Sequence, residues 1–194
     1  MPHMSTRPPS SAHPTGQAGF SAIELMVVLS ILGVLSALAA PAMSDLLARW
    51  RTNAVAEQVT AALTLAKVEA IRRSGNVVVQ KSSSSYSGST NDCTNNQQWS
   101  CGFIVYADID RNGTQDATDV ILREIDVPTG ISLLNMSGAS NAALTFNRWG
   151  LGNQGLNALH FRIRKIGLTD ADKSVCVSSG GRIRTVNSLD CPTS

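Results

Sequence analysis

The sequence predicts an α+β protein, in which one long N-terminal α-helix packs on an antiparallel β-sheet or β-sandwich. An apolar run covers residues 20–42, and helical periodicity continues after it through residues 43–75. Residues 76–194 carry short strand patterns separated by turns rich in Gly, Ser and Asn. Few charged and aromatic residues, together with many small polar ones, are typical of an exported β-rich domain.

The first half of the predicted helix, Phe20 to Ala42, is long and apolar enough to span a membrane. Its single charge is Glu24. A carboxylate near the centre of a bilayer costs about 2.5–3.5 kcal/mol, so this residue should gain a partner. Three alternatives stay open for the run. They are an ordinary membrane anchor, a buried core helix, and a signal peptide cleaved near Ala37-Leu38-Ala39, which would release a soluble periplasmic binding protein.

The second half of the predicted helix, residues 43–75, is amphipathic. Apolar residues recur there at helical spacing and form one stripe: Leu46, Trp50, Val55, Val59, Ala62, Ala66 and Ala70. Arg72 and Arg73 suit the negative end of the helix dipole, and Gly75 is the expected C′ residue that ends the helix. We expect the stripe to pack under the sheet.

Strand patterns follow the helix to the end of the chain. They are Val77–Val79, Gly102–Asp108, Val120–Val127, Ile131–Met136, Ala143–Phe146, Leu159–Ile166, Ser174–Ser178 and Arg182–Val186. A polar loop, Ser82–Ser100, separates the first two. An Asp-rich turn between the second and third patterns predicts a hairpin, and Gly180-Gly181 predicts another between the last two.

Four cysteines lie beyond the apolar run: Cys93, Cys101, Cys176 and Cys191. The absence of a C-x-x-C spacing argues against a zinc site. An even number in an exported domain favours disulfides, with three connectivities open. We favour Cys93–Cys101, which would close a polar loop, and Cys176–Cys191, which would fix the C-terminal tail. Both indicate the periplasm or the cell exterior.

Charge is distributed unevenly along the β-rich part. Residues 76–144 hold three basic and seven acidic side chains, a net of −4, whereas residues 145–194 hold seven basic and three acidic, a net of +4. This split predicts a polarised surface. An anionic partner would therefore prefer the C-terminal part of the chain.

Arginines in the C-terminal part fall on strand faces. By the two-residue period of strands, His160, Arg162 and Arg164 share one face, and Arg182 and Arg184 share the face of another strand. If the two strands align these faces, a cationic patch forms. Further candidates for it are Lys165, Lys173 and Arg148. Arginine forks suit phosphate oxygens, and contacts of this kind are independent of sequence.

No motif in the sequence indicates catalysis, so we expect no enzyme activity and no cofactor. His160 lies in a strand pattern and is expected to be a surface or packing residue. Gly150 to Gly155 match G-x-G-x-x-G. A strand pattern follows them, however, where the dinucleotide motif needs a helix to hold the pyrophosphate. A flexible loop is the preferred interpretation.

One segment is similar to a calcium loop. Asp108, Asp110 and Asn112 occupy positions one, three and five, Gly113 follows at six, and Asp119 stands at twelve. Strand patterns flank the segment where a calcium loop has helices, and the same residues are common turn formers. We therefore predict a turn without a metal, with calcium as the weaker alternative.

The junction Gly19-Phe20-Ser21-Ala22-Ile23-Glu24-Leu25 resembles the prepilin junction of type IV pilins and type II secretion pseudopilins. The resemblance implies that residues 1–19 are a leader removed by prepilin peptidase between Gly19 and Phe20. It also implies N-methylation of Phe20 and pairing of Glu24 with the terminal amine of a neighbouring subunit. The expected fold is then the type IV pilin fold. The chain would be held by one pass in the inner membrane, with the C-terminal domain in the periplasm, before assembly into a pilus or pseudopilus, where it could reach the cell surface.

Two further segments, Gly102 to Gly113 and Val177 to Arg184, resemble the FimT/GspH family of minor pilins. The ending Gly181-Arg182-Ile183-Arg184 is similar to the Gly-Arg-x-Arg motif with which FimT-type competence pilins bind DNA. By this resemblance, Arg182 and Arg184 would contact double-stranded DNA without sequence preference during DNA uptake. The alternative is a purely structural protein, either a pseudopilin H of type II secretion or a priming minor pilin.

Overall fold

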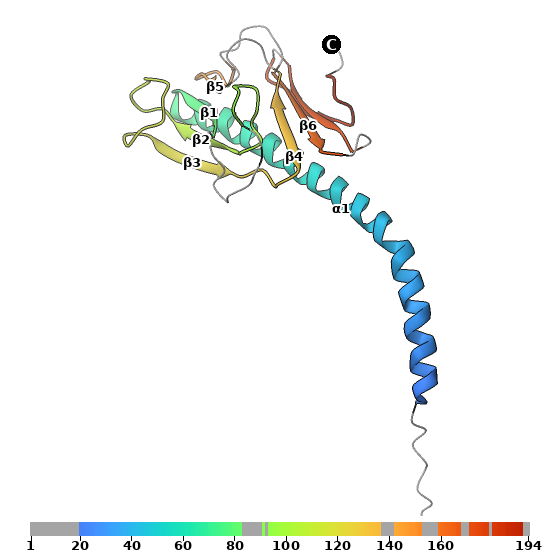
Figure 1. Ribbon diagram of the computed structural model, residues 1–194. Helices are drawn as coiled ribbons and strands as arrows, with labels where there is room; N and C mark the ends of the chain where they lie inside the picture. Colours follow the sequence, from blue (N-terminus) through green and yellow to red (C-terminus); the bar gives the residue numbers. More distant parts are fainter. Residues whose placement is uncertain are drawn as a thin grey trace, which may run out of the picture. The chain divides into compact units, whose positions relative to one another are not determined.

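The computed structural model describes residues 20–82, 91, 93–136, 142–152, 159–167, 171–178 and 180–191. The chain is divided into two compact units, with the boundary between residues 42 and 43. The division falls within helix α1 (Ala22–Arg73), which belongs to both units (Figure 1). Among the described residues, the second unit also contains the strands β1 to β8.

In the first unit, the described residues belong to the apolar start of α1. Residues 20–39 are all exposed, including Phe20 at 78%. Ala22–Ala39 is long and apolar enough to cross a membrane, by length and composition. The helix continues through Pro41 without interruption.

The C-terminal end of α1 differs from the sequence expectation by one residue. The Ser74 amide donates to the Ile71 carbonyl and the Gly75 amide to the Ala70 carbonyl, both at 3.2 Å. These two bonds form a Schellman motif, in which the C′ residue takes a left-handed conformation. That residue is Ser74, with φ of 50°, and not Gly75 as predicted.

In the second unit, α1 buries one face against the sheets. The buried residues of this face are Ala48, Thr52, Val55, Ala56, Val59, Ala62, Leu63, Ala66 and Ala70. The predicted stripe is therefore confirmed from Val55 onward. The prediction is wrong for the first two residues of the stripe, since Leu46 and Trp50 are 42% and 62% exposed. The buried face begins instead with the small residues Ala48 and Thr52.

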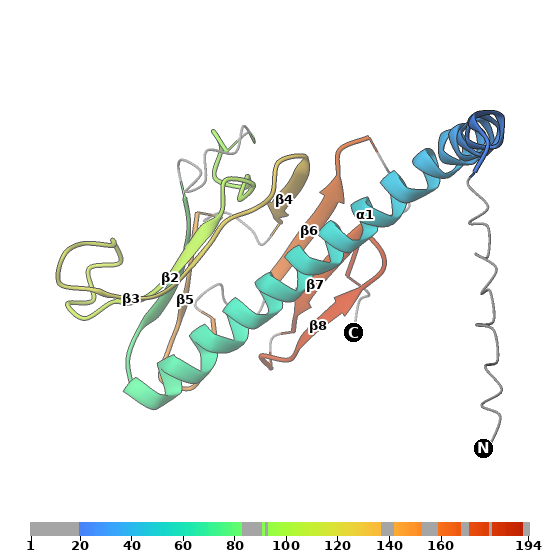
Figure 2. The ribbon, with the colours of Figure 1, turned by 90° about the horizontal axis from the view of Figure 1, so that it is seen from below.

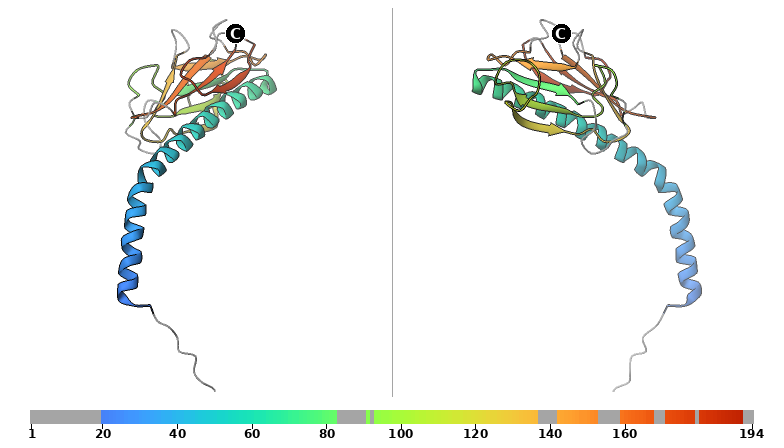
Figure 3. Two further views of the ribbon diagram at one scale, coloured as in Figure 1. Left: turned by 90° about the vertical axis from the view of Figure 1, so that its right-hand side faces the viewer. Right: turned by 60° about the vertical axis from the view of Figure 1, so that its left-hand side comes forward.

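Two four-stranded antiparallel sheets lie on the same side of this part of α1 (Figures 2 and 3). The first has the order β3-β2-β1-β5 and consists of β3 (Val120–Ile125), β2 (Phe103–Ala107), β1 (Val77–Lys81) and β5 (Ala143–Phe146). The second has the order β4-β6-β7-β8 and consists of β4 (Ile131–Asn135), β6 (Leu159–Lys165), β7 (Lys173–Val177) and β8 (Ile183–Val186). The predicted α+β class is confirmed.

One hydrophobic core joins α1 to both sheets. Trp99 is fully buried in it and contacts two aromatic rings, Phe103 of β2 and Phe161 of β6, at centroid distances of 5.7 and 5.2 Å. The amide of Trp99 also donates to the carbonyl of Leu133 in β4 at 2.8 Å. The loop before β2 thereby connects the two sheets.

We expect Phe161→Ala to lower the free energy of unfolding by about 3–5 kcal/mol, because it leaves a cavity where both sheets meet. Urea titration of the full chain in detergent measures this change. Val68→Ala is the control: Val68 is 54% exposed on α1, and its truncation should change the free energy by less than about 0.5 kcal/mol. Equal effects of the two substitutions would contradict a shared core.

Candidate functional site

The arginines of the C-terminal motif lie on a hairpin between β7 and β8. These strands pair antiparallel, as Gly180-Gly181 predicted. Ser178 and Arg182 close the turn, since the Ser178 amide donates to the Arg182 carbonyl at 2.9 Å and the Arg182 amide to Ser178 Oγ at 3.2 Å. Gly181 has φ of 75°, which only glycine adopts without strain.

Gly181 is buried and contacts helix α1. Lys67 Nζ donates to the Gly181 carbonyl at 2.8 Å. A Cβ atom at Gly181 would lie 2.9 Å from Lys67 Nζ and 3.5 Å from the carbonyl oxygen of Gly150. The turn after β7, the loop after β5 and α1 therefore meet at this glycine. Gly181 shapes the site and presents no side chain to a ligand.

The loop after β5 carries a further cation beside an aromatic side chain. Arg148 is exposed, and so is Trp149 at 73%. Asn147 shapes the loop, because its Oδ1 accepts hydrogen bonds from the amides of Trp149 at 2.9 Å and Leu151 at 3.2 Å. The contact between Gly150 and Gly181 sets this loop against the arginine hairpin.

We call the set Lys67, Arg148, Trp149, Arg182 and Arg184 the turn surface. Arg182 is exposed and has no acidic partner among the described residues. Arg184 is half-buried and stands opposite Cys176 on β7. Sequence reasoning identified the three arginines but missed Lys67 and Trp149. The position of Lys67 beside the Ala62–Ala70 stripe was the available signal, since it placed a cation at the edge of the buried helix face.

The other expected arginines share a face with Arg184 but are paired with acids. The registers His160–Cys176–Arg184 and Arg162–Ser174 set these side chains on one face of the second sheet. Arg162 forms an ion pair with Asp190, and Arg164 Nε donates to Asp172 Oδ2 at 3.2 Å. The faces are therefore aligned as predicted, while the charges of Arg162 and Arg164 are already compensated.

The C-terminal tail, residues 187–191, lies over β7 on this same face. The Leu189 carbonyl accepts hydrogen bonds from His160 Nε2 and Ser174 Oγ, both at 2.7 Å, and from Arg162 Nε at 3.1 Å. The disulfide between Cys176 and Cys191 fixes the tail there, and Cys93 is joined to Cys101. Both favoured disulfides are confirmed. His160 is a hydrogen-bonded packing residue.

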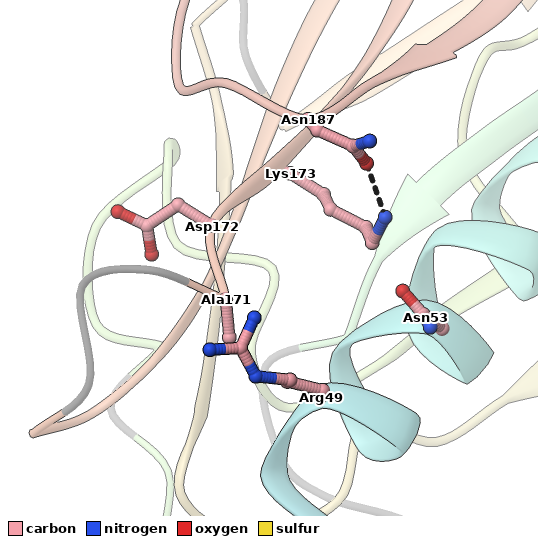
Figure 4. Close-up of a pocket in the computed structure, with 6 residues that line it drawn as sticks. All are labelled: Arg49, Asn53, Ala171, Asp172, Lys173 and Asn187. Carbon is pink, nitrogen blue, oxygen red and sulfur yellow. Dashed lines mark hydrogen bonds between the residues drawn. The ribbon is translucent and has the colours of Figure 1, made fainter. Parts of the chain in front are cut away.

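The two lysines expected in the patch lie elsewhere. Lys173 stands opposite Ile163, whose side chain is buried in the core, so it projects from the face of the sheet opposite to Arg162. Lys173 Nζ donates to Asn187 Oδ1 beside a cavity of about 250 Å³ that Arg49 and Asn53 of α1 also line (Figure 4). Lys165 lies beside Gly130, since a Cβ atom added at that glycine would be only 3.4 Å from Lys165 Nζ. The eight predicted residues thus do not form one continuous patch.

The Asp-rich segment forms the connection between β2 and β3, which pair antiparallel as predicted. One carboxylate oxygen from each of Asp108, Asp110 and Asp119 lies within 4.8 Å of the others. Asn112 was expected to offer its carbonyl, but Oδ1 accepts hydrogen bonds from Thr114. Its Nδ2 donates to Asp110 and Asp116 instead.

Two other predicted features are only partly within the described residues. Gly19 lies outside them, whereas Phe20 is exposed and Glu24 is in the first turn of α1. A negative charge there suits the positive end of the helix dipole. Of the glycine-rich motif, residues 153–155 lie outside the described part, and Gly150 packs against Lys67 and Ile71 of α1.

Two family models match the chain. Residues 55–181 match the model described as type II transport protein GspH, and residues 14–40 match the prokaryotic N-terminal methylation motif. The type IV major alpha-pilin of Moraxella bovis is 35% identical over 69 residues, which are 36% of this chain and 43% of that protein. The chain therefore spans less than half the length of this curated relative.

The fold is similar to that of the type IV minor pilin FimU of Pseudomonas aeruginosa strain PAO1. One FimU crystal structure matches with a TM-score of 0.56 and 22% identity, over 75% of this chain and 96% of that one. A second crystal form matches with a TM-score of 0.50 and 22% identity, over 73% and 98%. At this identity the likeness concerns the fold alone.

We expect Cys176→Ala combined with Cys191→Ala to lower the free energy of unfolding by about 3 kcal/mol, because the bond closes 15 residues of chain. Hydrogen exchange in residues 187–191 should rise as the tail separates from β7. The control, Cys93→Ala with Cys101→Ala, should leave that exchange unchanged. A tail that stays protected without its disulfide would show that the hydrogen bonds of Leu189 are sufficient.

Proposed function

Because the chain belongs to the GspH family of type II transport proteins and carries a prokaryotic N-terminal methylation motif, we propose that it is a minor pilin of a type IV pilus that binds double-stranded DNA. Pilin families assemble with further pilin subunits, and the apolar start of α1 fits a membrane-anchored pilin. Binding of DNA at the turn surface, without sequence preference, would serve DNA uptake. We expect no enzyme activity.

Maturation follows the pilin route in this proposal. Prepilin peptidase cleaves between Gly19 and Phe20, and the new terminal amine of Phe20 is methylated. The chain then rests in the inner membrane through residues 20–42, with its C-terminal domain in the periplasm. The match of residues 14–40 to the methylation motif and the exposure of Phe20 support this sequence of events.

The observation that carries DNA binding is the position of three arginines of the turn surface, of which Arg182 has no acidic partner among the described residues. Arg182 is exposed on the hairpin, Arg184 follows it, and Arg148 lies on the neighbouring loop. Lys67 adds a positive charge beside the hairpin, where its Nζ donates to the Gly181 carbonyl. Guanidinium forks bind phosphate oxygens in pairs, and backbone contacts of this kind require no base sequence.

Weak binding by one subunit would suffice in a filament. Several subunits on one DNA molecule raise the effective concentration of each further contact. The alternative is a structural pseudopilin or priming minor pilin, in which the turn surface contacts protein neighbours. The DNA measurement below separates these two functions.

We expect Arg182→Gln with Arg184→Gln to weaken DNA binding and its salt dependence. Removal of two phosphate contacts should make the slope of log K against log salt less steep by about 2 units. The measurement is a fluorescence titration of a mixed-sequence duplex with the full chain in detergent, at several salt concentrations.

The matched control is Arg162→Gln with Arg164→Gln, which removes the same charge from arginines that are already paired with acids. Its affinity and salt slope should stay close to those of the unaltered chain. Equal losses in both double variants would contradict binding at the turn surface. Absence of binding by the unaltered chain would favour the structural alternative.

A further inference from the structure

Three carboxylates converge in the loop between β2 and β3, away from the turn surface. One oxygen each from Asp108, Asp110 and Asp119 lies within 4.8 Å of the other two. None of these residues forms an ion pair with a lysine or arginine among the described residues. Three negative charges at this spacing repel one another unless a cation lies between them.

Asp108 supplies a second and independent observation. The residue is only 5% exposed, and its Oδ1 atom is buried without a hydrogen-bond donor among the residues that the structure describes. Its Oδ2 atom accepts the Gly113 amide at 3.1 Å. A buried carboxylate oxygen without a partner is destabilising, and a bound metal ion would remove that cost.

The other two carboxylates are held in place by the backbone. Asp119 Oδ1 accepts the Ile109 amide at 3.0 Å, and its Oδ2 accepts the Asp116 amide at 3.1 Å. Asp110 Oδ1 accepts the Asn112 amide at 3.1 Å. These bonds orient the acidic side chains without neutralising their charge, so a concentrated negative potential remains.

Tyr106 of β2 lies beside the loop, because its hydroxyl is 3.4 Å from the carbonyl oxygen of Gly113. Arg111 belongs to the loop but is exposed.

We propose that Asp108, Asp110 and Asp119 bind one Ca²⁺ ion in the loop between β2 and β3, with Asp108 Oδ1 as its buried ligand. Water and loop carbonyls complete the coordination. Calcium tolerates irregular sets of six to eight oxygen ligands, whereas Mg²⁺ requires near-octahedral geometry. Asn112 holds Asp110 and Asp116 together through its Nδ2 and is not a ligand.

The affinity should fall in the range of extracellular modules, with a dissociation constant of about 10⁻⁴ M. The site is independent of DNA binding. Its effect would be to order the loop between β2 and β3 outside the cytoplasm.

The test compares thermal unfolding of the full chain in detergent with 1 mM CaCl₂, with 1 mM MgCl₂ and with EGTA, at equal ionic strength. Calcium should raise the melting temperature by about 3–6 °C above the EGTA value, and magnesium should raise it less. An unchanged melting temperature in calcium would overturn the proposal. An equal rise with magnesium would overturn the assignment to calcium.

Two variants locate the effect. Asp108→Asn and Asp110→Asn should each abolish the calcium-dependent rise, and Asp110 is exposed, so its substitution leaves the buried structure intact if Asp108→Asn fails to fold. Asp45→Asn, at an exposed position of α1, is the control that should retain the full rise. A full rise in Asp110→Asn would overturn the assignment of the site.

Discussion

Close contact between helix α1 and the two sheets depends on small side chains along one helix face. Ala62, Ala66 and Ala70 are fully buried, and each leaves room for a strand or loop to approach the helix axis. Lys67 extends from the edge of this face to the carbonyl of Gly181. The packing that builds the core therefore also positions the arginine hairpin.

Much of the fold follows from local patterns. The spacing of Val55, Val59 and Ala62 gave the helix face, and alternation with turn residues gave the strands and both hairpins. The start of the buried face at Ala48 could not be predicted, because large apolar residues such as Trp50 fit the same period. Whether an apolar side chain is buried depends on where the sheets begin, and that is a tertiary property.

The candidate site also depends on tertiary contacts that the sequence pattern does not predict. The arginines were visible in the sequence, whereas their compensation was not, since Arg162 and Asp190 are 28 residues apart. The strand register was needed to show which face of the sheet Lys173 occupies. The burial of Asp108, likewise, depends on how the loop folds around it. Local sequence identifies charged groups, but tertiary contacts decide which of them remain available to a ligand.

The N-terminal part of the same helix, residues 20–39, is covered by no described residue. Residues 20–39 are apolar and exposed, with Glu24 as their single charge. We expect these residues to pack against neighbouring subunits in the membrane and in the filament. The most direct measurement is the fraction of Glu24→Ala chain found in sheared, pelleted filaments. That fraction should fall strongly while the variant accumulates in the membrane. Incorporation equal to that of the unaltered chain would contradict a role for this carboxylate in assembly.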